Sequence, residues 1–380
     1  MTQAKKGLDG VSLGESRLSL VNGTEGKLVY AGYKIEDLAA SALYEEIVYL
    51  LWNGRLPNAV EFETLRYALA TQAVVPSEVL AAMKLYPKDA NPMAVLRTTT
   101  SMLAFYDADS EDTSIEAQKR KAVRMTGQVT TLCAAWSRIR KGEEPVAPRQ
   151  DLTLAANFMY MLTNAAPEKT AVDVMNAYMV LLTEHSMNAS TFASRVATST
   201  GADMHSAIVA AMGTLKGPAH GGANEEAMRM FLEIGEVENV EPWFTKYIKS
   251  GERRIMGIGH RVYKALDPRA AVLRERAKAL AEASGNTKWF LIADNLAELA
   301  RADQYFIERN LYPNVDYFSA IALSTIHIEV DMFTPLFALS RMAGWTAHII
   351  EQQQDNRLIR PTADYVGPMG LEWVPMDQRA

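Results

Sequence analysis

The sequence predicts a mainly α-helical protein that carries a small N-terminal β-hairpin. Apolar residues recur at helical spacing along most of the 380 residues, and Gly and Pro stand where helices would begin and end. Long alternating patterns typical of strands are missing. A 48% share of hydrophobic residues and a 22% share of charged ones are typical of a globular chain rather than a disordered one.

The predicted hairpin lies in residues 17–33, the one stretch that looks like strands. Two short runs flank Asn22 and Gly23, a dipeptide that is common in tight hairpin turns. We therefore expect two short strands that turn near Gly23.

Further along the chain, capping residues mark helix boundaries. Asn91 and Pro92 read as an N-cap and a first helical residue, and Asp267 and Pro268 start another helix. Five helices are predicted in this way. The first runs through Leu43 to Leu51 and ends before Gly54, the second runs from Pro92 through Leu103, and a long third one covers residues 115–140. The fourth is opened by Pro167 and runs through Leu182, and the fifth runs from Pro268 and ends before Gly285.

No Ser/Gly linker divides the chain, so candidate domain boundaries come from local glycine clusters. Residues 213–222 and the region 313–316 bracket about 100 residues that could move as a unit. We expect a large domain interrupted by a smaller, inserted one.

Composition excludes several classes of partner. The net charge of −6 and a pI near 5.7 argue against a surface that neutralises nucleic acid. No apolar run approaches the ~20 residues of a membrane span, and the first residues lack the apolar segment of a secretory signal. The one cysteine, Cys133, lies in an apolar helical run and is predicted to pack in the core. We expect a cytoplasmic protein without a nucleic-acid or membrane partner.

Two of the six histidines lie in glycine-rich breaks between helices. His220, in Gly-Pro-Ala-His-Gly-Gly, stands just before a helix start, where free backbone N–H groups favour a neutral imidazole or a bound anion. His260 follows Gly257-Ile-Gly, and this segment fails the dinucleotide-binding fingerprint because no strand clearly precedes it. Lys264 is available there for a phosphate, and Arg269 in a first helical turn suits a carboxylate.

Asp316 precedes an apolar helical run over residues 321–328. From spacing alone we favour a helix N-cap, and the alternative is a general base held near a carbon acid. By themselves, six other residues receive a structural interpretation: His185, His205, His327, His348, Arg341 and Arg360.

Motifs for a metal site, a phosphate-binding loop or a serine nucleophile are missing from the sequence. The glycine-flanked histidines, the loop carboxylate and the arginines suit proton transfer next to a carbonyl of an anionic substrate. The residues alone go no further than this class of reaction.

Four motifs, in order, resemble the citrate synthase family. The resemblance covers nearly the whole chain, and its motifs are Gly-Pro-Ala-His220-Gly-Gly-Ala-Asn, Gly-Ile-Gly-His260-Arg-Val-Tyr-Lys with Asp-Pro-Arg269-Ala, Pro-Asn-Val-Asp316-Tyr-Phe-Ser, and Phe-Thr-Pro-Leu-Phe-Ala-Leu-Ser-Arg341-Met-Ala-Gly-Trp.

The resemblance implies a two-domain helical homodimer with a shared active site. A large domain of residues 1–220 and 319–380 would carry the dimer contacts, and a small domain of residues 221–318 would bind CoA and close over the site. The implied reaction condenses acetyl-CoA with oxaloacetate and hydrolyses the thioester, with neither a metal nor a prosthetic group.

The same resemblance implies residue roles. Asp316 would remove a proton from the acyl α-carbon, His220 would hydrogen-bond the thioester oxygen, and His260 would polarise the oxaloacetate carbonyl. Oxaloacetate would be held by His185, Arg269, Arg341 and, from the other subunit, Arg360. CoA would lie against Met256, Gly257, Ile258, Gly259, Lys264 and Asn314.

Three departures from the family pattern bear on substrate preference: Ala31, Ser186 and Thr362 stand where arginine, an acidic residue and arginine are frequent. A 2-methylcitrate synthase, which uses propionyl-CoA, shares the same motifs and is the first alternative, since one methylene is worth only about 1–3 kcal/mol in a pocket. An alternative of another class is a catalytically silent helical dimer that acts as a binding module.

Overall fold

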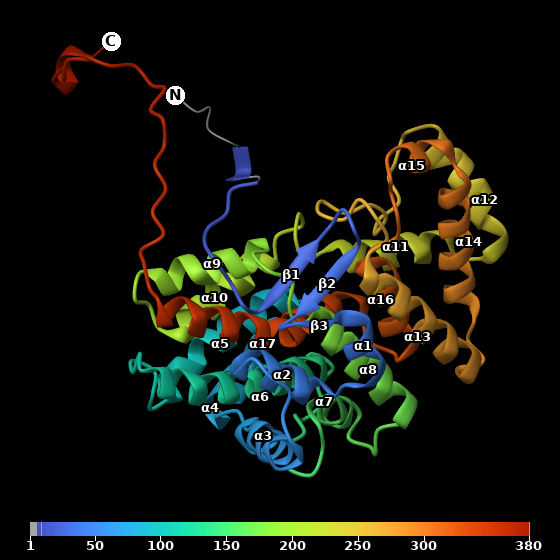
Figure 1. The fold of residues 1–380 in the computed structure, drawn as a ribbon, viewed down its shortest axis with the longest axis horizontal. Helices are drawn as coiled ribbons and strands as arrows, with labels where there is room; N and C mark the ends of the chain where they lie inside the picture. The colour runs from blue at the N-terminus through green and yellow to red at the C-terminus, as the bar shows by residue number, and fades with distance from the viewer. Residues whose placement is uncertain (1–5, 9, 380) are drawn as a thin grey trace.

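The computed structural model describes residues 6–8 and 10–379, and within them 17 α-helices and one three-stranded sheet form the fold (Figure 1). The predicted mainly α fold is therefore confirmed. A first group of helices comprises α1 (Ile35–Ser41), α2 (Tyr44–Asn53), α3 (Ala59–Gln72), α4 (Ser77–Lys84), α5 (Pro92–Leu103), α6 (Ile115–Ile139), α7 (Leu154–Thr163), α8 (Lys169–Leu182), α9 (Ala189–Ser199), α10 (Met204–Leu215) and α17 (Phe333–Gln354).

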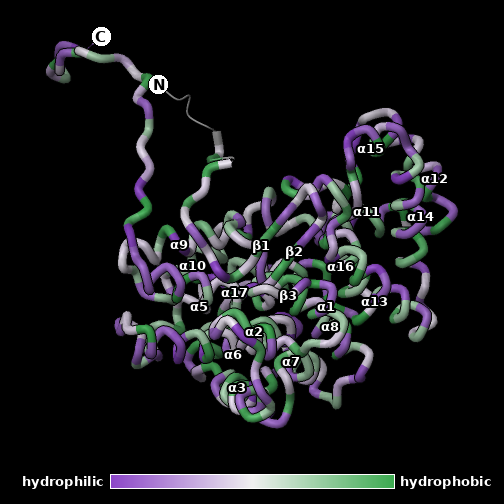
Figure 2. The backbone as a smooth tube through the Cα atoms, in the orientation of Figure 1, coloured by the Kyte–Doolittle hydropathy of each residue, from purple (hydrophilic) through white to green (hydrophobic). Residues whose placement is uncertain are grey.

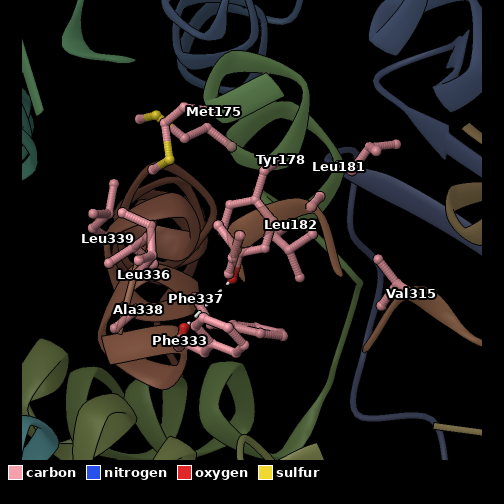
Figure 3. Packing of buried hydrophobic residues seen from close by; sticks show 14 of the residues in the cluster. Met175, Tyr178, Leu181, Leu182, Val315, Phe333, Leu336, Phe337, Ala338 and Leu339 are labelled. Carbon is pink, nitrogen blue, oxygen red and sulfur yellow. Dashed lines mark hydrogen bonds between the residues drawn. The ribbon is translucent and has the colours of Figure 1, made fainter. Parts of the chain in front are cut away.

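Helix α17 forms the centre of this group. It packs against α2, α6, α8, α9 and α10, and nearly all of its residues are buried. A helix that is buried on every side lies in the hydrophobic core, with its neighbouring helices packed around it. Figure 3 shows one such contact, in which Met175 and Tyr178 of α8 lie over Leu336 and Phe333 of α17, and the Tyr178 hydroxyl donates to the Phe333 carbonyl at 3.5 Å.

A second group of helices lies along one side of the body (Figure 1). It comprises α11 (Ala223–Ile234), α12 (Val240–Trp243), α13 (Pro268–Ser284), α14 (Lys288–Ala302), α15 (Gln304–Glu308) and α16 (Val315–Thr325). Helix α13 packs on α16 and also on α8 and α1, so it joins the two groups. The second group falls in the predicted small domain of residues 221–318, apart from most of α16, and the domain boundaries stay a prediction.

The predicted hairpin is confirmed, and it is one strand larger than expected. Strands β1 (Ser19–Asn22) and β2 (Lys27–Tyr30) pair antiparallel, and the two-residue β3 (Tyr33–Lys34) pairs with β2. The turn between β1 and β2 is four residues long. Gly23 in it is required for close approach, because a Cβ there would stand 2.1 Å from the Val262 carbonyl oxygen.

Helix boundaries follow the predicted caps with two exceptions, the start of α8 described here and the cap of α16 described with the candidate site. The Asn91 side chain accepts from the Ala94 N–H at 3.1 Å, and Gly54 and Gly285 end their helices with φ of 72° and 69°. The helix predicted to open at Pro167 begins instead at Lys169, because Glu168 still has the extended backbone of an N-cap. Cys133 is buried in α6 as predicted, and burial raises the pKa of its thiol.

Among the described residues, every helix is too short or too polar to cross a membrane. After α17 the chain runs away from the body as an extended segment (Figure 1). Polar and apolar residues are mixed along it (Figure 2).

Gly127→Ala should destabilise the fold, because its Cβ would stand 2.6 Å from the Leu69 carbonyl oxygen where α6 crosses α3. We expect a loss of about 1–3 kcal/mol in the free energy of unfolding, measured from urea titrations of tryptophan fluorescence. Gly213→Ala in α10 is the control, since its nearest atom is 3.8 Å away. The control should be neutral or should gain up to about 1 kcal/mol. Equal stabilities of the two variants would contradict the packing described for α6.

Candidate active site

Six predicted site residues come from six different segments. His185 follows α8, His220 precedes α11, His260 lies in the loop before α13, and Arg269 and Asp316 lie in the first turns of α13 and α16. Arg341 lies on the buried central helix α17.

The two loop histidines 185 and 260 meet around a tyrosine. The ring centroids of His185 and His260 are 5.6 Å apart, and Tyr263 lies 5.6 Å from the first and 4.9 Å from the second. The Tyr263 hydroxyl is 3.3 Å from His185 Nε2. Tyr263 is buried and was missed by the sequence analysis, because an aromatic residue in a loop carries no signal of its own.

Backbone hydrogen bonds determine which ring nitrogen of His260 carries the proton. Its Nδ1 accepts from the backbone N–H groups of Val262 and Tyr263, at 3.0 and 3.2 Å. The proton of the neutral ring is therefore on Nε2, which can donate to a ligand. Burial, followed by the nearby Arg269, lowers the pKa of His260 to about 4. At neutral pH this side chain is an uncharged hydrogen-bond donor.

In His220 the other ring nitrogen carries the proton. Its Nε2 is 2.8 Å from Ser190 Oγ and 3.3 Å from the Ser190 backbone N–H, which can only donate. This contact places the proton on Nδ1. Ser190 Oγ is held in turn by the indole N–H of Trp345 at 3.2 Å. Burial, with a smaller contribution from Arg341, lowers the pKa of His220 to about 4.

Arg269 is buried against Asp267. Its Nε and one terminal nitrogen donate to the two carboxylate oxygens at 3.0 and 2.8 Å. The same carboxylate accepts from the backbone N–H of Arg269 at 3.0 Å and from that of Val315 at 3.2 Å. Asp267 therefore caps α13, as predicted, and also ties the start of α16 to it.

Arg341 is buried, and only part of its guanidinium group forms hydrogen bonds within the described residues. Its Nε donates to the Leu182 carbonyl at 2.6 Å, and the guanidinium lies 4.8 Å from the centre of the Phe337 ring. One terminal nitrogen has no hydrogen-bond partner among the described residues. A buried cation with a free donor is suited to bind an anionic ligand.

Asp316 is not the N-cap that its spacing favoured. Asn314 caps α16 instead, by accepting from the Asp316 backbone N–H at 2.9 Å, and Asp316 stands inside the first turn. Burial raises the pKa of its carboxyl to about 6, against the opposing effect of Arg269 and Arg341. A partly buried carboxylate with this pKa is still ionised at pH 7 and is a stronger base than a solvated one.

Most of the residues predicted to bind CoA lie together. Gly259 N–H donates to Tyr312 O at 2.8 Å, Asn314 N–H donates to Gly257 O at 2.9 Å, and the Asn314 side chain donates to Gly259 O at 2.8 Å. These bonds hold residues 256–259 beside Asn314. Lys264 is exposed, and its backbone N–H donates to Gly23 of the hairpin at 2.9 Å.

Arg360 is not brought to this group within one chain. It is exposed beyond the end of α17, where Ile359 N–H donates to Ser199 Oγ at 3.1 Å. It lines a cavity of about 1150 Å³ with residues of the N-terminal segment. Of the histidines interpreted as structural, His205 and His348 are buried and His327 is exposed.

A family model described as "Citrate synthase, C-terminal domain" matches residues 7–362. The chain belongs to the citrate synthase family. It is 46% identical to "Citrate synthase 2" of Bacillus subtilis over 378 residues, which cover 99% of this chain and 100% of that one. It is 43% identical to "Citrate synthase" of Haloferax volcanii, with 99% of both chains covered.

Solved citrate synthases share the fold. The enzyme from Pyrobaculum aerophilum has a TM-score of 0.92 at 37% identity and covers 98% of this chain and 95% of its own. A citrate synthase from Thermoplasma acidophilum, solved as a ternary complex with carboxymethyl coenzyme A and oxaloacetate, has a TM-score of 0.92 at 35% identity. That match covers 98% of this chain and 99% of the other.

Asp267→Asn should be strongly destabilising, because it leaves the Arg269 guanidinium buried without its counter-charge. We expect a loss of about 3–5 kcal/mol in unfolding free energy, read from urea titrations. Asp294→Asn is the control, since the pair of Asp294 with Arg274 is partly exposed and should contribute only about 0–1 kcal/mol. A small loss in Asp267→Asn would show that Arg269 can reach water.

Proposed function

We propose that this chain is a citrate synthase that condenses acetyl-CoA with oxaloacetate and hydrolyses the resulting thioester to give citrate and CoA. The observation that carries the proposal is the site itself: a carboxylate of raised pKa, two uncharged imidazole donors and two buried arginines, in a chain that matches citrate synthases over its full length. The Thermoplasma acidophilum relative, solved with a CoA derivative and oxaloacetate, supports this pair of substrates.

Asp316 is assigned to the first step as the base that takes a proton from the methyl carbon of acetyl-CoA. Such a proton is weakly acidic, so the negative charge that develops on the thioester oxygen needs a preorganised donor. We assign this donor to His220 Nδ1–H, which Ser190 fixes in position. Because the His220 ring is neutral, it stabilises the enol by donating a hydrogen bond to the thioester oxygen and does not transfer its proton to that oxygen before the α-proton is removed.

His260 is assigned to the second step. Its Nε2–H polarises the ketone of oxaloacetate, and the enol carbon attacks the carbonyl carbon. The new alkoxide takes up a proton, which balances the one that Asp316 removed from acetyl-CoA. Arg269, Arg341 and His185 hold the two carboxylates of oxaloacetate and fix its orientation. Water then attacks the thioester and releases CoA. CoA itself is assigned to Met256 to Gly259, Lys264 and Asn314.

Acetyl-CoA is preferred to propionyl-CoA in this proposal. Five relatives named citrate synthase are 39–46% identical and a sixth is 36% identical. A Bacillus subtilis relative named for both citrate and 2-methylcitrate is 38% identical, and a Mycobacterium tuberculosis relative named for 2-methylcitrate alone is 37% identical. Comparison of kcat/KM for the two acyl-CoAs on one preparation tests this choice. A silent binding module has little support, because every catalytic position expected from the family is present.

We further propose that the protein's own groups suffice, without a metal or prosthetic group. In support, the described residues include no cluster of three His, Cys, Asp or Glu side chains that could hold a metal ion. A cytoplasmic location is also proposed, and the single, buried and unpaired Cys133 is compatible with a reducing compartment.

A homodimer with a shared site is the proposed assembly. Within the described part of the chain, residues 362–379 form hydrogen bonds only with one another, and they expose several large apolar side chains. These side chains are Tyr365, Val366, Met369, Leu371, Trp373 and Met376. A second copy of this chain would cover them and would let Arg360 of one subunit reach the oxaloacetate site of the other.

Asp316→Asn should lower kcat by about 10²–10⁴-fold, because the amide cannot accept the proton. The assay follows CoA thiol release with acetyl-CoA and oxaloacetate, and Asp173→Asn on the exposed face of α8 is the control. In the wild type, kcat/KM should fall about tenfold per pH unit below about pH 6, where Asp316 becomes protonated. No CoA release by the wild type would refute the proposed function, and a fully active Asp316→Asn would refute this base.

Mixed dimers test whether Arg360 acts across the interface. Arg360→Ala should raise the KM for oxaloacetate without changing the dimer mass. Equal amounts of Arg360→Ala and Asp316→Asn chains are unfolded together, refolded and assayed with oxaloacetate far below the KM of Arg360→Ala. About a quarter of wild-type activity should return, since half of the dimers are mixed and each has one intact site. Activity that stays at the level of the separate variants would place Arg360 in its own subunit's site or outside both.

A further inference from the structure

A completely buried glutamate stands next to the oxaloacetate site. Glu184 directly precedes His185, and its Oε1 accepts from the Ser19 hydroxyl at 2.9 Å and from the Ser186 backbone N–H at 2.5 Å. His348 Nε2 lies 3.0 Å from the same oxygen. None of the steps assigned above uses this carboxylate.

The carboxylate fixes the backbone on both sides of His185. Ser186 has a φ of 51°, which is unusual for a residue with a side chain, so the turn needs outside contacts to hold it. Ser19 Oγ also accepts from the Ser186 N–H, at 3.0 Å. On the other side, the Tyr30 hydroxyl donates to the Glu184 carbonyl at 2.8 Å. His185 is thus carried on a turn that Glu184 and the hairpin hold together.

Groups behind Glu184 set its orientation. A guanidinium only donates, so the 2.9 Å contact of Arg195 with His348 Nδ1 makes that nitrogen an acceptor. His348 therefore donates from Nε2 to Glu184. Arg195 is itself held by Glu351 at 2.7 Å and by Gln352 at 3.0 Å.

Glu184 also faces the helix that carries Arg341. Arg341, Gly344 and His348 share one face of α17, and a Cβ on Gly344 would stand 2.7 Å from Glu184 Oε2. Burial by itself would raise the pKa of Glu184, but His348, Arg341 and Ser19 outweigh it and the pKa is lowered. The carboxylate is therefore ionised beside the Arg341 cation.

We propose that Glu184 is a positioning residue for oxaloacetate: through its Oε1 it holds the turn that presents His185 and, with His348 behind it, fixes that turn against the face of α17 that carries Arg341. It does not touch the substrate. This inference rests on the proposed function, because it takes His185 and Arg341 as the oxaloacetate clamp.

Two substitutions separate the acceptor atom from the charge. Glu184→Met keeps the length of the side chain and removes the acceptor. The buried Nε2–H of His348 then loses its partner and the Ser186 N–H keeps only Ser19 Oγ, so the KM for oxaloacetate should rise at least about tenfold. Glu184→Gln keeps an acceptor oxygen and should stay within about threefold of the wild type. The KM for acetyl-CoA should stay within about threefold in both variants, because the CoA segments lie elsewhere.

The matched control is Glu45, which is the other buried glutamate among the described residues. Its Oε1 accepts from the Leu154 N–H at 2.6 Å, and neither residue belongs to the candidate site. Glu45→Met should lower the melting temperature and leave the KM for oxaloacetate unchanged. If Glu184→Met does not fold, Ser19→Ala decides, since it removes one donor to Glu184 and one acceptor of Ser186. Ser19→Ala should then raise the KM for oxaloacetate about two- to fivefold, as expected for one hydrogen bond.

An unchanged oxaloacetate KM in Glu184→Met, or in Ser19→Ala where that variant decides, would overturn the positioning role. An equal rise in Glu184→Gln would also overturn it, since the charge rather than the acceptor would then be responsible. These outcomes are read only after the wild type has released CoA. A wild type without turnover refutes the proposed function and this inference with it. An active wild type whose KM for oxaloacetate does not change when Glu184 is substituted refutes this inference alone.

Discussion

The buried pair of Asp267 and Arg269 is the interaction on which the site depends. A guanidinium in the protein interior is tolerated only with a hydrogen-bonded counter-charge, and Asp267 supplies it from the adjoining N-cap. Because the same carboxylate also binds the Val315 N–H, the first turns of α13 and α16 share one anchor. The position of Asp316 relative to Arg269 is therefore set by the fold before any substrate arrives.

The groups around this anchor leave an excess of positive charge and of hydrogen-bond donors, which suits the dianion oxaloacetate. Arg341 is buried with one terminal nitrogen that has no partner in the described part of the chain. The three nearby imidazoles have lowered pKa values, so they add hydrogen-bond donors without adding positive charge. Protonated imidazoles would bind the dianion more tightly, but they would also stabilise Asp316 as a carboxylate and weaken it as a base. The burial that keeps these rings neutral therefore supports the proposed role of Asp316 as a base as well as the proposed binding of oxaloacetate.

Local signals explain what could be predicted from the sequence. Caps such as Asn91 and Asp267, and glycine stops such as Gly54, act within a few residues, so the helix ends that they mark agree with the structure. Glycines beside His220 and His260 pointed to the site for the same local reason. The spacing around Asp316 misled, because Asn314 is an equally good cap two residues earlier and only the backbone path decides between them.

Long-range contacts explain what could not be predicted. Tyr263 and Glu184 lie at the candidate site through contacts with residues that are distant in sequence. Tyr263 stands inside the family motif around His260, but only its contact with His185 shows what it does. Arg360 is the reverse case: its role was implied by resemblance, and a single chain leaves it exposed, so only a second subunit could complete that assignment.

The N-terminal hairpin illustrates why these long-range contacts matter for chemistry. Its turn lies against the His260 loop so closely that Gly23 has no room for a side chain, and it also binds the Lys264 N–H. Its second strand supplies Tyr30, which holds the Glu184 carbonyl beside His185. One small sheet thus supports two loops that carry histidines, and those loops have no secondary structure of their own to hold them. In the described part of the chain, the three-stranded sheet therefore holds the two histidine loops of the candidate site in fixed positions relative to each other.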